Sequence, residues 1–497
     1  MKTDDGKEFA AKHWFDGFSC VHRFEIDFDA GSPHVTYTSR RTVDEMLEAV
    51  RKTGKLNSIT FAAQRDPCDS FFQKVMSIFK PKPNIHNIGV TLSVNMPGGG
   101  SVKNGQKQVA ATNGHTNGIE TLHVKTDAYD MKNIDPVTLE PKGVTTQTKL
   151  HPDLKGPLSA AHAKTDPDTG DLFNYNLEMG RQSTYRVFCI SASTGETRIL
   201  AAFPGKPAYL HSLLLTSNHV ILCVWNSHIK WGGISILYES NILDAIAPFD
   251  PNSKATWYVV DRTGKGLVAT YESDPFFSFH SINAWEEPSA SDPSKTDILC
   301  ELSLYDSTDV VHRFYYDNLM SLHSDSKKYA GKKRMPHLPS QAQFRLPSVN
   351  AGVSSPKPLP AELVFKADKL ISMELPIINP AYLTRKHRYV YGVADRLKST
   401  YFDGIVKFDN VTQTSTFWET EAHTPGEPIF VADPEGTKED DGVLLTVVLD
   451  GFKEKSYLLV LDARDLSELG RADMQGPMSF GFHGTHKATG RNYTGDV

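Results

Sequence analysis

The stretch Asp274–Glu287, DPFFSFHSINAWEE, decides the fold, because its middle is an apolar, strand-like run that carries a single histidine, His280. Successive side chains of a strand alternate between two faces, so Phe277 and Phe279 share one face while Phe276 and His280 share the other. An unpaired polar group in such a strand costs about 1–3 kcal/mol, so the imidazole needs a polar partner. The ring is therefore either a core side chain bonded to a backbone carbonyl or part of a functional site.

Short strand-like runs separated by turns continue outward from this stretch through the whole chain. Val21–Phe28 and His34–Ser39 predict a hairpin, and Ala208–Trp225 predicts two apolar strands joined by a turn. Repeated short strands predict an all-β fold and favour a closed β-propeller over a sandwich. Because closed β architectures exceed the usual domain length as one unit, we expect a single domain over residues 1–497.

Three segments interrupt the pattern of strands. Residues 98–118 are of low complexity and residues 324–362 are rich in Lys, Pro and Ser, so we expect both to be flexible insertions. Asp69–Phe79 places its apolar side chains on one helical face and predicts an amphipathic helix. This helix either covers a sheet or dips into a membrane surface.

Composition excludes several classes of protein. The net charge of −6 and the pI of about 6.3 do not favour a nucleic-acid partner. The five cysteines are scattered, which is typical of reduced thiols in a cytoplasmic protein. The chain has no apolar run long enough to span a membrane, and from its polar first residues we expect no signal peptide.

Four of the nineteen histidines lie among apolar or small residues near turns: His162, His211, His280 and His483. They are far apart in the sequence, as expected for ligands gathered from different blades around one axis. Neutral imidazole is a common metal ligand, and a set of nitrogen donors suits iron, zinc or copper. Their spacing alone leaves structural histidines as the alternative.

Seven segments, in order along nearly the whole chain, resemble the signature segments of the carotenoid cleavage oxygenases. The amino-acid sequences of these segments are most similar to those of the fungal branch that cleaves torulene and apocarotenals. The segments are HWFDG (His13–Gly17), LHPDLKGPLSAAHAKTDPDTGDLFNY (Leu150–Tyr175), YLHSLLLTSNHVIL (Tyr209–Leu222), FHSINAWEE (Phe279–Glu287), ELPIINPAYLTRKHRYVYG (Glu374–Gly392), PGEPIFVADP (Pro425–Pro434) and GFHGTH (Gly481–His486).

The resemblance implies a seven-bladed β-propeller with a helical dome over its top face. It also implies one Fe(2+) per chain on the propeller axis, held by the four histidines. Glu374 and Glu427 match glutamates that orient such ligands, since a carboxylate that accepts one ring N–H aims the other nitrogen at the metal.

Two departures from the family pattern stand out. Lys125, in VKTD, stands where many members carry a third glutamate, so we expect another group to orient one histidine and the lysine to contact the substrate or to be an exposed strand residue. The chain also begins close to HWFDG, so we expect that N-terminal strands are missing or that one blade is incomplete.

The implied function is a non-haem iron dioxygenase that uses O2 to cleave a conjugated C=C bond of a carotenoid or apocarotenoid, such as torulene, into two carbonyl products. The substrate would lie in an apolar tunnel, with Phe277, Phe279, Trp285 and Lys125 as candidate contacts. For the three aromatic residues, core packing is the alternative interpretation. A peripheral membrane contact would suit so apolar a substrate.

Two other functions remain open at this point. Some relatives cleave stilbenes of the resveratrol type and grip the phenol with a lysine, which makes Lys125 suggestive. The second alternative is a catalytically inactive propeller that serves as a binding module.

Overall fold

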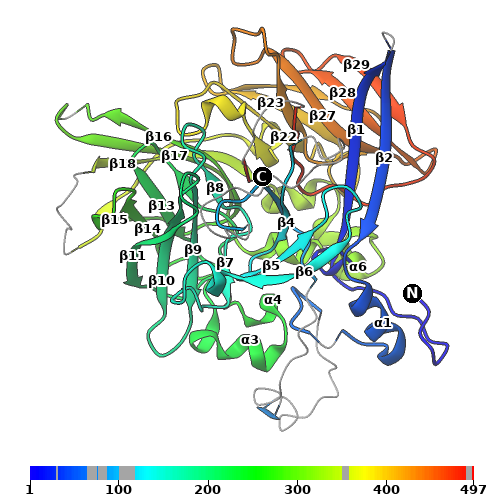
Figure 1. The fold of residues 1–497 in the computed structure, drawn as a ribbon, viewed down its shortest axis with the longest axis horizontal. Helices are drawn as coiled ribbons and strands as arrows, with labels where there is room; N and C mark the ends of the chain where they lie inside the picture. Colours follow the sequence, from blue (N-terminus) through cyan, green and yellow to red (C-terminus); the bar gives the residue numbers. More distant parts are fainter. Residues whose placement is uncertain are drawn as a thin grey trace.

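The computed structural model describes residues 1–29, 32–56, 58–63, 75–76, 87–99, 118–290, 292–349, 357–488 and 495–496. Sheets of mainly antiparallel strands stand around a common centre, and their order around the ring follows the sequence (Figure 1). The predicted all-β propeller class is confirmed.

In the described part of the chain the ring has six blades, each a sheet of four or five strands. The strands of the first three blades are β3 (Thr91–Val94), β4 (Leu122–Lys125), β5 (Asp130–Ile134), β6 (Pro141–Thr146) and β30 (Gly495–Asp496); β7 (Leu158–Ser159), β8 (Lys164–Thr165), β9 (Leu172–Glu178), β10 (Thr184–Ile190) and β11 (Thr197–Pro204); and β12 (Leu214–Leu215), β13 (His219–Val224), β14 (Ala255–Asp261), β15 (Gly266–Ser273) and β19 (Leu359–Pro360).

The strands of the other three blades are β16 (Phe277–Pro288), β17 (Thr296–Tyr305), β18 (Ser340–Val349) and β20 (Glu362–Lys366); β21 (Glu374–Ile377), β22 (Tyr389–Ala394), β23 (Gly404–Asp409) and β24 (Thr414–Trp418); and β25 (His423–Pro425), β26 (Ile429–Ala432), β27 (Gly442–Asp450), β28 (Lys455–Asp462) and β29 (Glu468–Asp473). Strand β30 pairs with β3, so the end of the chain joins its first blade.

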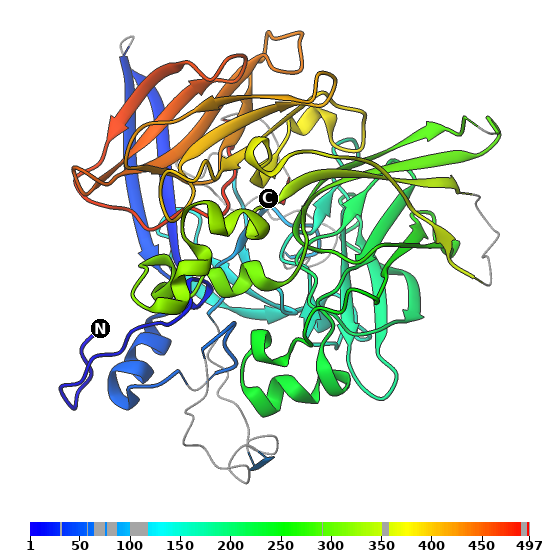
Figure 2. The same cartoon turned by 180° about the vertical axis from the view of Figure 1, so that it is seen from behind.

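The prediction of seven blades was wrong. Between the blade of β3–β6 and that of β25–β29 lies a hairpin of β1 (Cys20–Asp29) and β2 (Ser32–Arg41), seen in blue in Figures 1 and 2. Among the described residues these two strands pair only with each other. A sequence pattern indicates strands but not their partners, because pairing depends on contacts between distant segments.

Among the residues that the structure describes, helices are few and short, as expected for a propeller with helices over its sheets. They are α1 (Asp44–Thr53), α3 (Ile234–Glu239), α4 (Ile242–Ala245), α5 (Asp309–Arg313), α6 (Tyr316–Leu319), and the 3-10 helices η1 (Trp14–Asp16), η2 (Gln147–Lys149), η3 (Lys230–Gly233), η4 (Ser324–Tyr329), η5 (Gly331–His337), η6 (Lys369–Ile371) and η7 (Pro380–Tyr382). Both views place α1 and α3 along the lower side of the molecule (Figures 1 and 2). No helix in the described part of the chain is both long and apolar enough to cross a membrane.

Of the three segments predicted to interrupt the strands, two lie largely outside the described residues and the third contains a strand of a blade. The predicted helix Asp69–Phe79 lies outside the described residues except for Val75 and Met76, and so does nearly all of the predicted insertion 98–118. Within 324–362, however, the structure has η4, η5 and β18, and β18 pairs with β17 and β20. Residues 340–349 therefore form a strand of a blade and are not an insertion.

The core next to the predicted site is aromatic. The ring of Phe276 lies 5.9 Å from that of Trp257 and 5.4 Å from that of Phe344, so the start of Asp274–Glu287 is packed between blades. All three side chains are buried. This packing fixes the strand that carries His280, since a close-packed core allows little displacement.

Candidate metal centre

The structure brings together the four histidines that the sequence singled out. One ring nitrogen from each of His162, His211, His280 and His483 lies within 4.8 Å of those of the others. His280 stands on β16, whereas the other three lie on segments outside the strands. The His162 backbone amide donates to the His211 carbonyl at 3.2 Å, which ties two of these segments together.

A carboxylate orients the ring of His280. Its Nδ1 lies 2.5 Å from Oε2 of Glu374, the first residue of β21. The same carboxylate oxygen accepts a hydrogen bond from the Leu375 backbone amide at 2.8 Å. Because Nδ1 donates its proton to the carboxylate, Nε2 is the nitrogen left free for a metal.

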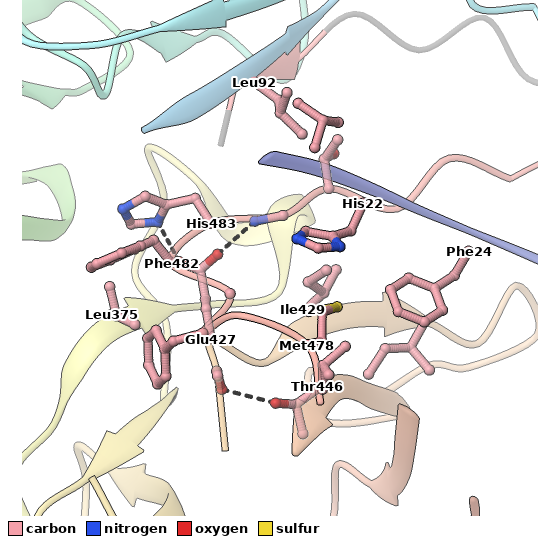
Figure 3. A pocket seen from close by; sticks show the side chains of 18 of the residues that line it. His22, Phe24, Leu92, Leu375, Glu427, Ile429, Thr446, Met478, Phe482 and His483 are labelled. Carbon is pink, nitrogen blue, oxygen red and sulfur yellow. Dashed lines mark hydrogen bonds and ion pairs between the residues drawn. The ribbon is translucent and has the colours of Figure 1, made fainter. Parts of the chain in front are cut away.

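His483 is oriented in the same way by the second predicted glutamate. Its Nδ1 lies 2.9 Å from Oε1 of Glu427, and the Gly484 backbone amide donates to Oε2 at 2.9 Å. Figure 3 shows the Glu427 carboxylate reaching up between these two groups. Each glutamate thus holds a ring nitrogen and is itself fixed by a backbone amide.

The third oriented ring has a partner that the sequence analysis missed. Both carboxylate oxygens of Asp127 lie 2.8 Å from Nδ1 of His211. The aspartate comes two residues after Lys125, where β4 has ended, so the chain turns its side chain toward the cluster. The acidic residue at the end of VKTD is the sequence signal for this partner.

His162 differs from the other three, because no carboxylate of the described residues bonds to its ring. Its Nε2 lies 3.1 Å from Nε2 of His483, so the two nitrogens point at the same place. Burial, followed by the charges of the neighbouring histidines, lowers its pKa well below the ordinary value. The pKa of His280 falls to about 4, because burial outweighs the opposing effect of Glu374. Both rings are therefore neutral at pH 7.

These four rings fit a metal ion. The Nε2 atom of His280 is buried and has no hydrogen-bond partner in the structure, which is costly unless a ligand occupies the site. Neutral imidazole is the form that binds metals, and four nitrogen donors suit iron, zinc or copper. The cluster can therefore hold a metal.

A large cavity opens beside this cluster. Its volume is about 1540 Å³, and His211, His280 and His483 form part of its wall. Aromatic side chains line it near the histidines, and it continues beneath the β1–β2 hairpin, where His22 and Phe24 face it (Figure 3). Its lining near the histidines includes Phe15, Phe61, Phe279, Phe314 and Phe482. An apolar chamber of this size next to a polar cluster suits a hydrophobic small molecule.

The predicted substrate contacts are divided between this cavity and its surroundings. Phe279 lines the cavity, and Phe277 packs edge-on against it with the ring centroids 4.7 Å apart. Trp285 donates from its indole N–H to Glu287 at 3.0 Å and packs against His387. Lys125 is buried and lines a separate small cavity of about 20 Å³.

Comparison with known proteins finds that the chain is similar to carotenoid oxygenases. The family model described as RPE65, retinal pigment epithelial membrane protein, matches residues 2–488. The chain is 42% identical to a carotenoid dioxygenase of Neurospora crassa, over 99% of this chain and 85% of that protein. It is also 42% identical to a torulene dioxygenase of Fusarium fujikuroi, over 97% of this chain and 86% of that protein.

Solved structures support the fold. A variant of Synechocystis apocarotenoid oxygenase aligns with a TM-score of 0.70 at 21% identity, over 95% of this chain and 88% of that one. The cobalt-substituted form of the same Synechocystis protein aligns with a TM-score of 0.67 at 21% identity and equal coverage.

Proposed function

Because the chain belongs to the RPE65/carotenoid oxygenase family, we propose that it is a dioxygenase that cleaves a conjugated C=C bond of a carotenoid or apocarotenoid into two carbonyl products. The observation that carries this proposal is the four-histidine cluster beside an apolar cavity, three of whose histidines form part of the cavity wall. Torulene is the first substrate to test, since the Fusarium relative is named for it.

The metal of the proposal is Fe(2+), one per chain, held by His162, His211, His280 and His483. When bound, a ferrous ion supplies the redox chemistry that activates O2. The chain's own residues hold that ion, and Asp127, Glu374 and Glu427 keep three of the rings in the tautomer whose Nε2 faces it.

The cavity positions the substrate and keeps water away from it. Phe279 and the aromatic side chains around it offer flat apolar surfaces to a polyene, so the double bond nearest the cluster is selected by how far the substrate enters. Such walls also exclude water from the reacting atoms. Lys125, in its separate small cavity, gives no support to a phenol grip of the stilbene-cleaving kind.

The test is a substrate screen with identification of the products. Purified protein loaded with Fe(II) is given torulene, an apocarotenal and resveratrol under ¹⁸O2, and the carbonyl fragments are identified by mass spectrometry. We expect labelled fragments from a carotenoid and their loss in His280→Ala, whereas His323→Ala, at an exposed surface histidine, retains them. Cleavage of resveratrol alone would contradict the proposed substrate class, and no cleavage of any substrate would favour a binding module.

We also propose a peripheral membrane contact, through which so apolar a substrate would be delivered. Trp231, in η3, and Ile234, the first residue of α3, are 61% and 52% exposed. Large apolar side chains exposed close together are typical of an interfacial contact. Co-sedimentation with phosphatidylcholine vesicles should fall in the double variant Trp231→Ser and Ile234→Ser, but not in Val411→Ser, whose side chain is 72% exposed elsewhere. Equal binding by all three proteins would contradict this contact.

A further inference from the structure

Asp127 differs from the two glutamates that orient the other rings. Its side chain is one methylene shorter, and its carboxylate is held on both sides. Oδ1 accepts a hydrogen bond from the Ala161 backbone amide at 3.1 Å, and Oδ2 accepts one from the Tyr209 hydroxyl at 2.7 Å. A short carboxylate gripped at both oxygens has little freedom to turn away from His211.

Tyr209 is well placed to hold the Asp127 carboxylate in this position. It stands two residues before His211 and is 3% exposed. Its backbone amide donates to the Ser227 carbonyl at 3.0 Å, and its ring packs edge-on against Phe61 with the centroids 5.6 Å apart. The backbone and the ring are thus fixed before the hydroxyl makes its bond.

The positions of the protons follow from the donors available. His211 Nδ1 lies 3.4 Å from the Tyr209 oxygen but 2.8 Å from the carboxylate, so the ring N–H belongs to Asp127. A carboxylate oxygen only accepts hydrogen bonds, so the Tyr209 hydroxyl, 2.7 Å from Oδ2, donates its proton to Asp127. Both groups therefore donate to one carboxylate.

We propose that Tyr209 is a positioning residue, whose hydroxyl fixes Asp127 and, through it, the His211 ring at the metal cluster. This inference rests on the proposed metal site and deepens it. A tyrosine that only filled space would act through its ring, and one that contacted substrate would act independently of Asp127. Coupling between Tyr209 and Asp127 is what separates these roles.

The test measures metal binding without turnover. Co(2+) is titrated into metal-free protein and followed by its visible absorption, for the wild type, Tyr209→Phe, Asp127→Ala and the double variant. We expect Tyr209→Phe to weaken Co(2+) binding about 10-fold, the size typical of groups behind a ligand. The double variant should bind no more weakly than Asp127→Ala alone, because the hydroxyl then has nothing to position.

A matched control removes another buried tyrosine hydroxyl, on strand β15. Tyr271 donates to the Pro347 carbonyl at 2.8 Å and is 0% exposed, so Tyr271→Phe should bind Co(2+) like the wild type. Equal binding by Tyr209→Phe and the wild type, or additive losses in the double variant, would overturn the role of Tyr209 and leave the metal site standing. Failure of the wild type itself to bind Co(2+) would overturn the metal site and this inference together.

Discussion

Replacing Glu374 with glutamine removes the charge behind His280 while keeping the shape of the side chain. Both groups that bond to Oε2, the His280 ring N–H and the Leu375 amide, are donors, so the amide oxygen can take the place of the carboxylate oxygen. The fold should therefore survive. The ring then loses the charged partner that strengthens its bond to a metal.

The magnitude follows from the kind of bond that is lost. A hydrogen bond to a charged group is worth about 1.5–3 kcal/mol, and one between neutral groups about 0.5–1.5 kcal/mol. The difference of about 1–1.5 kcal/mol corresponds to a loss of roughly 5- to 12-fold in metal affinity. Glu374 is 3% exposed, so water cannot screen the change.

The assay is competition for Co(2+) or Fe(II) against a chromophoric chelator, with circular dichroism and thermal unfolding to confirm the fold. Glu362→Gln, at an exposed position on β20, serves as the control and should bind like the wild type. Unchanged affinity in a folded Glu374→Gln protein would refute the idea that this carboxylate supports the ligand.

Three further outcomes are expected. Asp395→Asn removes the charge between two buried arginines, Arg313 and Arg334, and should cost about 3–5 kcal/mol in urea unfolding; a loss under 1 kcal/mol would contradict it. Phe279→Ala should raise KM for a polyene and leave metal content unchanged, and a loss of metal would contradict a substrate role. Burial raises the pKa of Glu286, but hydrogen bonds, led by the one with His219, outweigh burial and hold this pKa at about 2. The wild type should therefore lose up to about 3 kcal/mol of folding stability as pH falls from 4.5 toward 2. Acid unfolding curves of Glu286→Gln should lack this loss.

The sequence predicted the class of fold but not its number of blades. Alternating strands and turns are local features, so the all-β class could be inferred. Whether Cys20–Asp29 and Ser32–Arg41 join a complete blade depends on partners elsewhere in the chain, and the structure leaves them as a two-stranded hairpin. The strand Ser340–Val349 was hidden for a related reason, since the Lys- and Pro-rich flanks around it suggested a loop.

The site was easier to predict where a motif carried it. His280 with Glu374, and His483 with Glu427, were found because each lies in a distinctive segment. Asp127 was missed because the end of β4 changes which side chain faces inward, and alternation along the strand no longer applies there. The contact between Tyr209 and Asp127 could not be predicted, since no sequence pattern places a hydroxyl 2.7 Å from a carboxylate.

The most direct measurement is the metal content of the protein by elemental analysis, after purification without added metal. The four-histidine site predicts one iron per chain, and its loss in His280→Ala while the variant stays folded. Protein that holds no iron, even after anaerobic loading with Fe(II), would contradict the site and with it the proposed dioxygenase.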